Sequence, residues 1–200
     1  MEAVEFQSSV DARPYESLSA LDRPHRFVAS GIWEIPVGRG RSLESNLPKA
    51  VEFLVGGWQL NGVLQKQSGP PLGFGDAWTL FTGDSTKIAL PKDQRNPDRW
   101  FNTDAGFNKN AAQQLANNRR VSPLRFNNIR ADGQSRWDLS VIKSFRVTEK
   151  VKTQFRAECL NAWNHPNLGT PNTTPTNGSF GAVTSQDVPR SWQFSLKVSF

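Results

Sequence analysis

The C-terminal segment RSWQFSLKVSF (190–200) alternates between polar and apolar side chains from its first residue to its last. Successive side chains of a β-strand point to opposite faces, so a period of two predicts a strand with one apolar face. The pattern therefore predicts a terminal strand that ends on an aromatic ring. The residues on its apolar face are Trp192, Phe194, Leu196, Val198 and Phe200.

Four earlier segments alternate in the same way, although less regularly. They predict strands near residues 26–35, 52–66, 134–147 and 151–162. One exception stands out, because Lys143 falls among apolar side chains and its long stem would have to reach a polar boundary. Together the five segments predict an all-β fold, an antiparallel meander of about five long strands.

The connections between these segments alternate between short and long. The short ones are 36–50 and 148–150, and the long ones are 67–133 and 163–189. In outer-membrane β-barrels the long loops lie outside the cell and the short turns face the periplasm. Placing both long connections outside directs the last strand inward, with Phe200 at the periplasmic end. The strands are also longer than the about 5–6 residues usual in soluble sheets and suit a tilted membrane-spanning strand of about 9–11 residues.

The residues that carry chemistry are sparse and scattered. Lys and Arg number 24 against 18 Asp and Glu, but they form no groove-like run, so we expect no nucleic-acid partner. Cys159 is the sole cysteine, and His25 and His165 lack partners at metal-ligand spacing, so we expect neither a metal nor a cofactor. Nucleophile, phosphate-binding and zinc-protease motifs are absent from the sequence, which predicts that the protein is not an enzyme.

The strand pattern leaves a second fold open. In a soluble β-sandwich, the apolar faces of two sheets pack on each other and the polar faces meet water. Such a chain would be a binding module, for instance for carbohydrate, with Trp58, Trp78 or Trp100 as stacking platforms. Solubility as a monomer without detergent would favour this alternative over a barrel.

Several short motifs occur in order along the chain. They are DRPHRF (22–27), EIPVG (34–38), GGWQLNG (56–62), QSGPP (67–71), WFNT (100–103), WDLS (137–140) with Lys143, FRAE (155–158), NAWNHPN (161–167), FG (180–181) and the terminal strand. In this combination they resemble the late barrel of TonB-dependent outer-membrane receptors. The nearest group is the Oar-like branch, whose members carry a carboxypeptidase-regulatory-like domain at the N-terminus.

The resemblance implies a place in a larger machine. The resemblance implies a barrel of about 22 strands with a plugged lumen. Transport through such a receptor is driven by the inner-membrane proton gradient. The chain would then be a C-terminal section of a transmembrane β-barrel, supplying lumen wall and two extracellular loops for uptake of a large solute. We expect a partial receptor, because plug and signal peptide are absent and a closed barrel needs about eight strands. TonB would be contacted only through the missing N-terminal parts.

Two further partners follow from the resemblance. The apolar strand faces would contact lipid of the bacterial outer membrane. The alternate side chains of the terminal strand, Trp192 to Phe200, resemble the signal by which the barrel-assembly machinery takes up outer-membrane proteins. Recognition would proceed by strand addition, in which backbone hydrogen bonds give affinity and alternate side chains give specificity.

Overall fold

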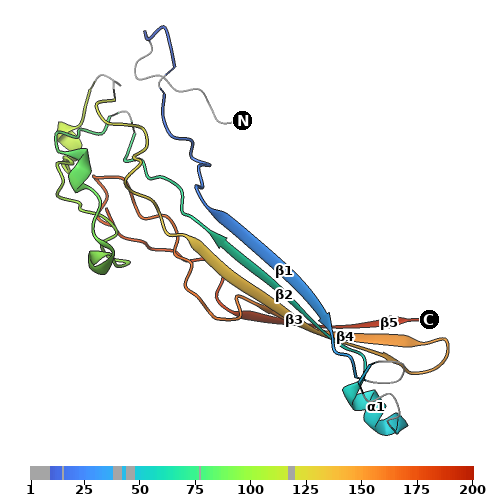
Figure 1. Cartoon of the computed structure of the whole chain (residues 1–200). Helices are drawn as coiled ribbons and strands as arrows, with labels where there is room; N and C mark the ends of the chain where they lie inside the picture. The colour runs from blue at the N-terminus through green and yellow to red at the C-terminus, as the bar shows by residue number, and fades with distance from the viewer. Residues whose placement is uncertain (1–9, 15, 38–41, 44–47, 77, 117–119) are drawn as a thin grey trace. The chain divides into compact units, whose positions relative to one another are not determined.

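The computed structural model describes residues 10–14, 16–37, 42–43, 48–76, 78–116 and 120–200. Five strands form one sheet, in which each strand pairs with its neighbours in the chain (Figure 1). The strands are β1 (Arg26–Glu34), β2 (Trp58–Gln67), β3 (Gln134–Arg146), β4 (Lys152–Leu160) and β5 (Ser191–Ser199). The expected all-β antiparallel meander is confirmed. Among the described residues, no helix has the length and apolar character needed to cross a bilayer.

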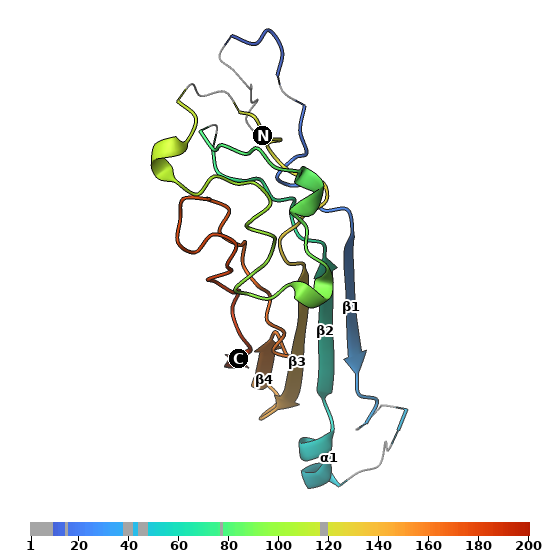
Figure 2. The same cartoon turned by 90° about the vertical axis from the view of Figure 1, so that its left-hand side faces the viewer.

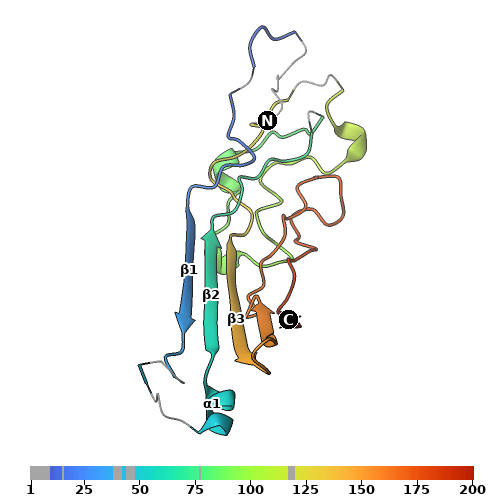
Figure 3. The ribbon, with the colours of Figure 1, turned by 90° about the vertical axis from the view of Figure 1, so that its right-hand side faces the viewer.

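The strand predicted over 52–66 is wrong in its first part. Residues Lys49–Val55 form helix α1, and the strand begins only at Trp58 (Figure 3). The run VEFLV holds four apolar residues in five, and so short a run does not distinguish a helix from a buried strand. Pro48 precedes the helix with a fixed φ of −55°, and the amide of Gly56 closes its last turn on the carbonyl of Glu52.

The chain leaves α1 through a glycine that the backbone requires. Gly57 has a φ of +72°, a left-handed conformation that side chains other than glycine rarely adopt. A Cβ at this position would also meet the carbonyl oxygen of Ser144 in β3. The turn GG at 56–57 therefore ends the helix and brings β2 against β3.

The register of β3, β4 and β5 separates apolar from polar side chains. In one face the partners across the three strands are Leu139–Cys159–Trp192, Val141–Ala157–Phe194, Lys143–Phe155–Leu196 and Phe145–Thr153–Val198. The opposite face holds Ser140–Glu158–Gln193, Ile142–Arg156–Ser195, Ser144–Gln154–Lys197 and Arg146–Lys152–Ser199. We call these the apolar face and the polar face. As the alternation predicts, Lys143 is a charged exception on the apolar face and Ile142 is an apolar exception on the polar face.

The contacts of the chain divide it into two compact units. The strand unit comprises the described residues of Arg26–Lys66, Ser135–Pro166 and Val188–Phe200. The loop unit comprises the described residues of Met1–His25, Gln67–Gln134 and Asn167–Asp187. Thus the two long connections that the sequence predicts are not separate loops, since they fold together into one unit.

The hydrophobic core of the described chain lies in the loop unit, which also carries three short 3-10 turns (Figure 2). The turns are Ser85–Lys87, Lys92–Gln94 and Ala111–Gln113. The buried side chains are Leu72, Phe74, Phe81, Ile88, Trp100, Phe101, Ala105, Phe107, Phe126, Ile129 and Ala131. At their centre the ring of Phe74 lies 4.6–5.3 Å from the rings of Phe101, Phe107 and Phe126. Such aromatic pairs stabilise a core beyond the area that they bury.

Candidate lipid-facing sheet and terminal strand

The proposed signal residues lie on the last strand of the sheet, where β5 pairs with β4. Trp192, Phe194, Leu196 and Val198 share the apolar face and expose 51–65% of their surface, and Phe200 lies one residue beyond β5 and is fully exposed. Rings on this face stack, with centroids 6.1 Å apart for Trp192 and Phe194 and 6.3 Å for Phe155 and Phe194. The structure thus presents a continuous apolar ladder whose role in assembly stays a prediction.

The strand at the other margin of the described sheet, β1, also exposes large apolar side chains, with Phe27 and Trp33 on one face and Ile32 on the other. Every residue of β1 is exposed, including Phe27 at 57%, Ile32 at 73% and Trp33 at 58%. Large apolar side chains exposed in such numbers are costly in water and mark a surface that meets lipid or another protein. Strand edges at the margins of a sheet also indicate a neighbour, because their backbone N–H and C=O groups need hydrogen-bond partners.

The end of the sheet where β3 turns into β4 is basic. A hollow of about 940 Å³ lies there, and both faces contribute to its lining, with Arg146, Lys152 and Lys197 from the polar face, Lys143 and Phe145 from the apolar face, and Phe53 from α1. Arg146 and Lys152 are direct partners across the two strands. Like charges in such a pair repel each other, so this end of the polar face favours water or an anion over hydrocarbon.

Lys143, the exception on the apolar face, is held by α1. Its side chain is only 7% exposed, and its Nζ donates to the carbonyl of Leu54 at 3.1 Å and to that of Gly56. The ammonium also lies 5.0 Å from the centroid of the Trp58 ring. The carbonyls at a helix C-terminus carry partial negative charge and aromatic faces attract cations, so the charge is satisfied where it stands.

Sequence reasoning missed this partner because it assigned Leu54 to a strand. A signal for the helix was present in the order Pro48, then a mostly apolar run, then Gly56-Gly57, which is typical of a helix start and stop. The aromatic core of the loop unit was also missed. Its phenylalanines are scattered over the long connections with no periodicity to relate them.

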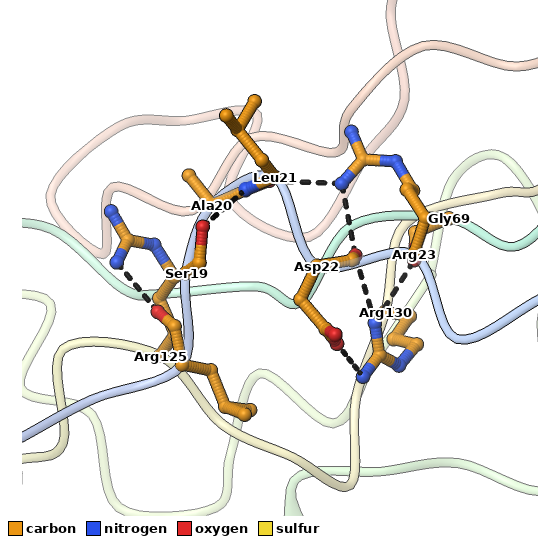
Figure 4. A network of polar contacts seen from close by, with 9 residues as sticks. Ser19, Ala20, Leu21, Asp22, Arg23, Gly69, Arg125 and Arg130 are labelled. Atoms are coloured by element: carbon orange, nitrogen blue, oxygen red, sulfur yellow. Dashed lines mark hydrogen bonds and ion pairs between the residues drawn. The ribbon is translucent and has the colours of Figure 1, made fainter. Parts of the chain in front are cut away.

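In the loop unit, the guanidinium of Arg130 joins segments next to three strands (Figure 4). Its Nη2 pairs with the Asp22 carboxylate at 2.5 Å, and its Nη1 donates to the carbonyls of Asp22 and Gly69 at 3.3 and 3.2 Å. Asp22 precedes β1, Gly69 follows β2 and Arg130 precedes β3. The motifs DRPHRF and QSGPP therefore meet at one side chain.

Two carboxyl groups of the loop unit have perturbed titration. Hydrogen bonds from Thr86 hold the pKa of Asp84 below its ordinary value, and a hydrogen bond from Lys109 does the same for Asp104. Both carboxyl groups are exposed, so these contacts fix local turns rather than build a reactive site. Among the described residues, no group of three or more His, Cys, Asp or Glu side chains could hold a metal ion.

A model of the outer membrane beta barrel domain matches residues 2–193 of the chain. The chain belongs to this outer membrane β-barrel family. Neither a curated protein nor a solved structure matches it. The five strands are therefore part of a barrel in the bacterial outer membrane, which agrees with their two-faced register and exposed apolar side chains.

Membership of the barrel family removes the β-sandwich alternative. A sandwich needs two packed sheets, whereas the strands of the described residues form one. Trp100 is buried in the core of the loop unit, Trp58 in the strand unit covers Lys143, and Trp78 is half-exposed.

Proposed function

We propose that the chain forms barrel wall of a TonB-dependent receptor that takes up a large solute. Its apolar face contacts outer-membrane lipid and its polar face lines the lumen, because outward faces of such barrels are apolar and their interiors polar. The observation that carries this proposal is the register of β3, β4 and β5, which gathers mostly apolar side chains in four successive rows on one face. The receptor type rests on the motifs that resemble the Oar-like branch.

We further propose that the loop unit is extracellular and contributes to solute recognition. In an antiparallel meander, the connections β2–β3 and β4–β5 leave the same end of the sheet, and both long connections have this position. A loop region with its own aromatic core can hold a fixed shape outside the membrane. The role is binding and passage rather than catalysis, and contact with TonB belongs to other parts of the receptor.

Depletion of solutes from the medium tests this function. Wild-type cells, cells that lack the gene for this protein and cells that lack TonB are grown in the same defined mixture of large solutes. We expect at least one solute that wild-type cells remove from the medium and that both mutants leave there. A protonophore should stop removal of this solute by wild-type cells, as loss of TonB does. A solute whose removal needs this protein but neither TonB nor the proton gradient would indicate a passive porin and contradict the proposal.

A further inference from the structure

Helix α1 contacts the sheet through an aromatic side chain and through its C-terminal carbonyls. The ring of Phe53 packs edge-to-face against Phe145 at a centroid distance of 4.9 Å, and Lys143 binds the carbonyls at the C-terminal end of the helix. Phe145 and Lys143 both lie on the apolar face, near the β3–β4 turn. The helix is thus fixed to the surface that we assign to lipid, at the end of the sheet with the short connections (Figure 3).

The side of α1 that turns away from the sheet is apolar as well. At 3.6 residues per turn, Val51, Leu54 and Val55 point away from Phe53, and they expose 41%, 68% and 39% of their surface. The acidic residue of the helix, Glu52, falls outside this arc. A helix whose outer side is apolar gains free energy only if something less polar than water covers it.

We propose that α1 is an interfacial helix that lies in the phospholipid leaflet at the periplasmic rim of the barrel. Lipid is the occupant that the structure favours, because the outer side of α1 continues the apolar face through the contact of Phe53 with Phe145. Interfacial helices bury their apolar side about 5–10 Å into the boundary between headgroups and acyl chains. Short loops that enter this zone are rare in barrels unless their backbone groups are bonded internally, as those of a helix are.

This placement gives Lys143 a function. A lysine on a lipid-facing strand is costly in hydrocarbon unless it reaches the interface or a partner. The C-terminal carbonyls of α1 are that partner, so the lysine fastens the helix to the barrel while the helix shields the charge. The inference goes beyond solute uptake and rests on two parts of the proposed function, the assignment of the apolar face to lipid and of the short connections to the periplasmic side.

Spin-label accessibility tests the inference. Single cysteines replace Leu54 on α1, Phe194 on the apolar face and Lys150 in the β3–β4 turn, in a chain with Cys159→Ala. The labelled protein is reconstituted in vesicles of phosphatidylethanolamine and phosphatidylglycerol, and collisions with oxygen and with a water-soluble nickel chelate are measured. We expect the label at Leu54 to collide with oxygen and not with the chelate, as at Phe194, and the label at Lys150 to show the reverse. A label at Val51→Cys serves as a second position on the same side of the helix and should behave like Leu54.

Three other outcomes would overturn the inference, and they differ from one another. Chelate collisions at Leu54 equal to those at Lys150 would place α1 in water. Low accessibility to both reagents at Leu54 and Val51 would indicate a protein partner instead of lipid. Chelate collisions at Phe194 equal to those at Lys150 would show that the apolar face itself does not meet lipid. None of these results bears on TonB dependence, so failure here is separable from failure of the proposed transport function.

Discussion

At the scale of single residues, Asn161 fixes the turn that follows β4. It is only 4% exposed and has a φ of +51°, a left-handed conformation that asparagine tolerates better than most residues. Its amide nitrogen Nδ2 donates to the carbonyl of His165 at 3.0 Å, and its Oδ1 accepts from the amide of His165 at 3.0 Å. The backbone amide of Asn161 donates to the carboxylate of Asp138 in β3 at 2.9 Å.

We therefore expect Asn161→Ala to destabilise the folded protein by about 2–4 kcal/mol, because it combines backbone strain with loss of buried hydrogen bonds. Asn161→Gly relieves the strain but not the lost bonds, so its effect should be about half as large. Urea unfolding of the protein in detergent, followed by circular dichroism, measures both variants. An Asn161→Ala midpoint equal to that of the native protein would contradict this account of the motif NAWNHPN.

Arg130 is the second residue whose replacement should have a large effect. Arg130→Ala removes a partly buried ion pair and two bonds to carbonyls, at a cost of about 2 kcal/mol for charged hydrogen bonds of this kind. Local opening of the loop unit should then rise about 30-fold, as measured by the rate of cleavage by external protease in its native state. Arg130→Lys keeps the charge but not the planar guanidinium, so its cleavage rate should lie between those of the native protein and of Arg130→Ala.

The matched control is Arg99→Ala, which replaces another loop-unit arginine and leaves the contacts of Arg130 with Asp22 and Gly69 in place. If Arg99→Ala and Arg130→Ala raise the cleavage rate equally, the network at Asp22 and Gly69 does not stabilise the unit. The experiment also tests whether the N-terminal segment before β1 is held by the loop unit, because cleavage near Asp22 should increase first.

At the scale of elements, the terminal strand is the one for which we propose a role beyond structure. Its exposed ladder of alternate apolar side chains ends on Phe200, which is fully exposed and has no packing role in the described chain. If the ladder is the signal for the barrel-assembly machinery, deletion of Phe200 in the exported protein should sharply lower the amount of heat-modifiable barrel in outer membranes. Ser199→Ala, one residue earlier on the polar face, should change little. Equal assembly of both variants would leave only an ordinary strand and remove the signal.

The strands were the most predictable elements, and the reason is physical. A period of two appears wherever one face of a strand is apolar, and a slip by one residue would invert every side chain. The predicted segments 26–35, 134–147, 151–162 and 190–200 accordingly lie within two residues of the observed ends of β1, β3, β4 and β5. The segment 52–66 failed at its start because α1 is held by tertiary contacts with Phe145 and Lys143, which local pattern does not reveal.

The candidate site was predictable only in part. Alternation located the ladder on β5 and singled out Lys143, but the acceptors of Lys143 lie 87 and 89 positions away in sequence. The motif Gln67–Pro71 was recognised by resemblance, but only the structure shows why a glycine is needed at position 69. A Cβ at Gly69 would collide with the carbonyl oxygens of Ala131 and Asp132, so this glycine allows the two chain segments to approach.

At the scale of the whole chain, the apolar side chains are divided between two environments. In the loop unit a cluster of them is buried around Phe74 and Phe101, while those of the strand unit are largely exposed on the apolar face and on β1. In a soluble protein the apolar side chains of the sheet would be covered by other parts of the fold. A membrane barrel with ordered outer loops accounts for both groups at once.

The most direct test of this account is the side of the membrane on which each end of the sheet lies. In cells that export the protein, single cysteines replace Asn110 in the loop unit and Glu149 in the β3–β4 turn, both of which are exposed. The native chain, whose Cys159 is buried, is the unlabelled control. The account predicts that an impermeant maleimide added to whole cells labels Asn110→Cys and leaves Glu149→Cys unlabelled until the outer membrane is broken. Labelling of Glu149→Cys but not of Asn110→Cys on whole cells would contradict it.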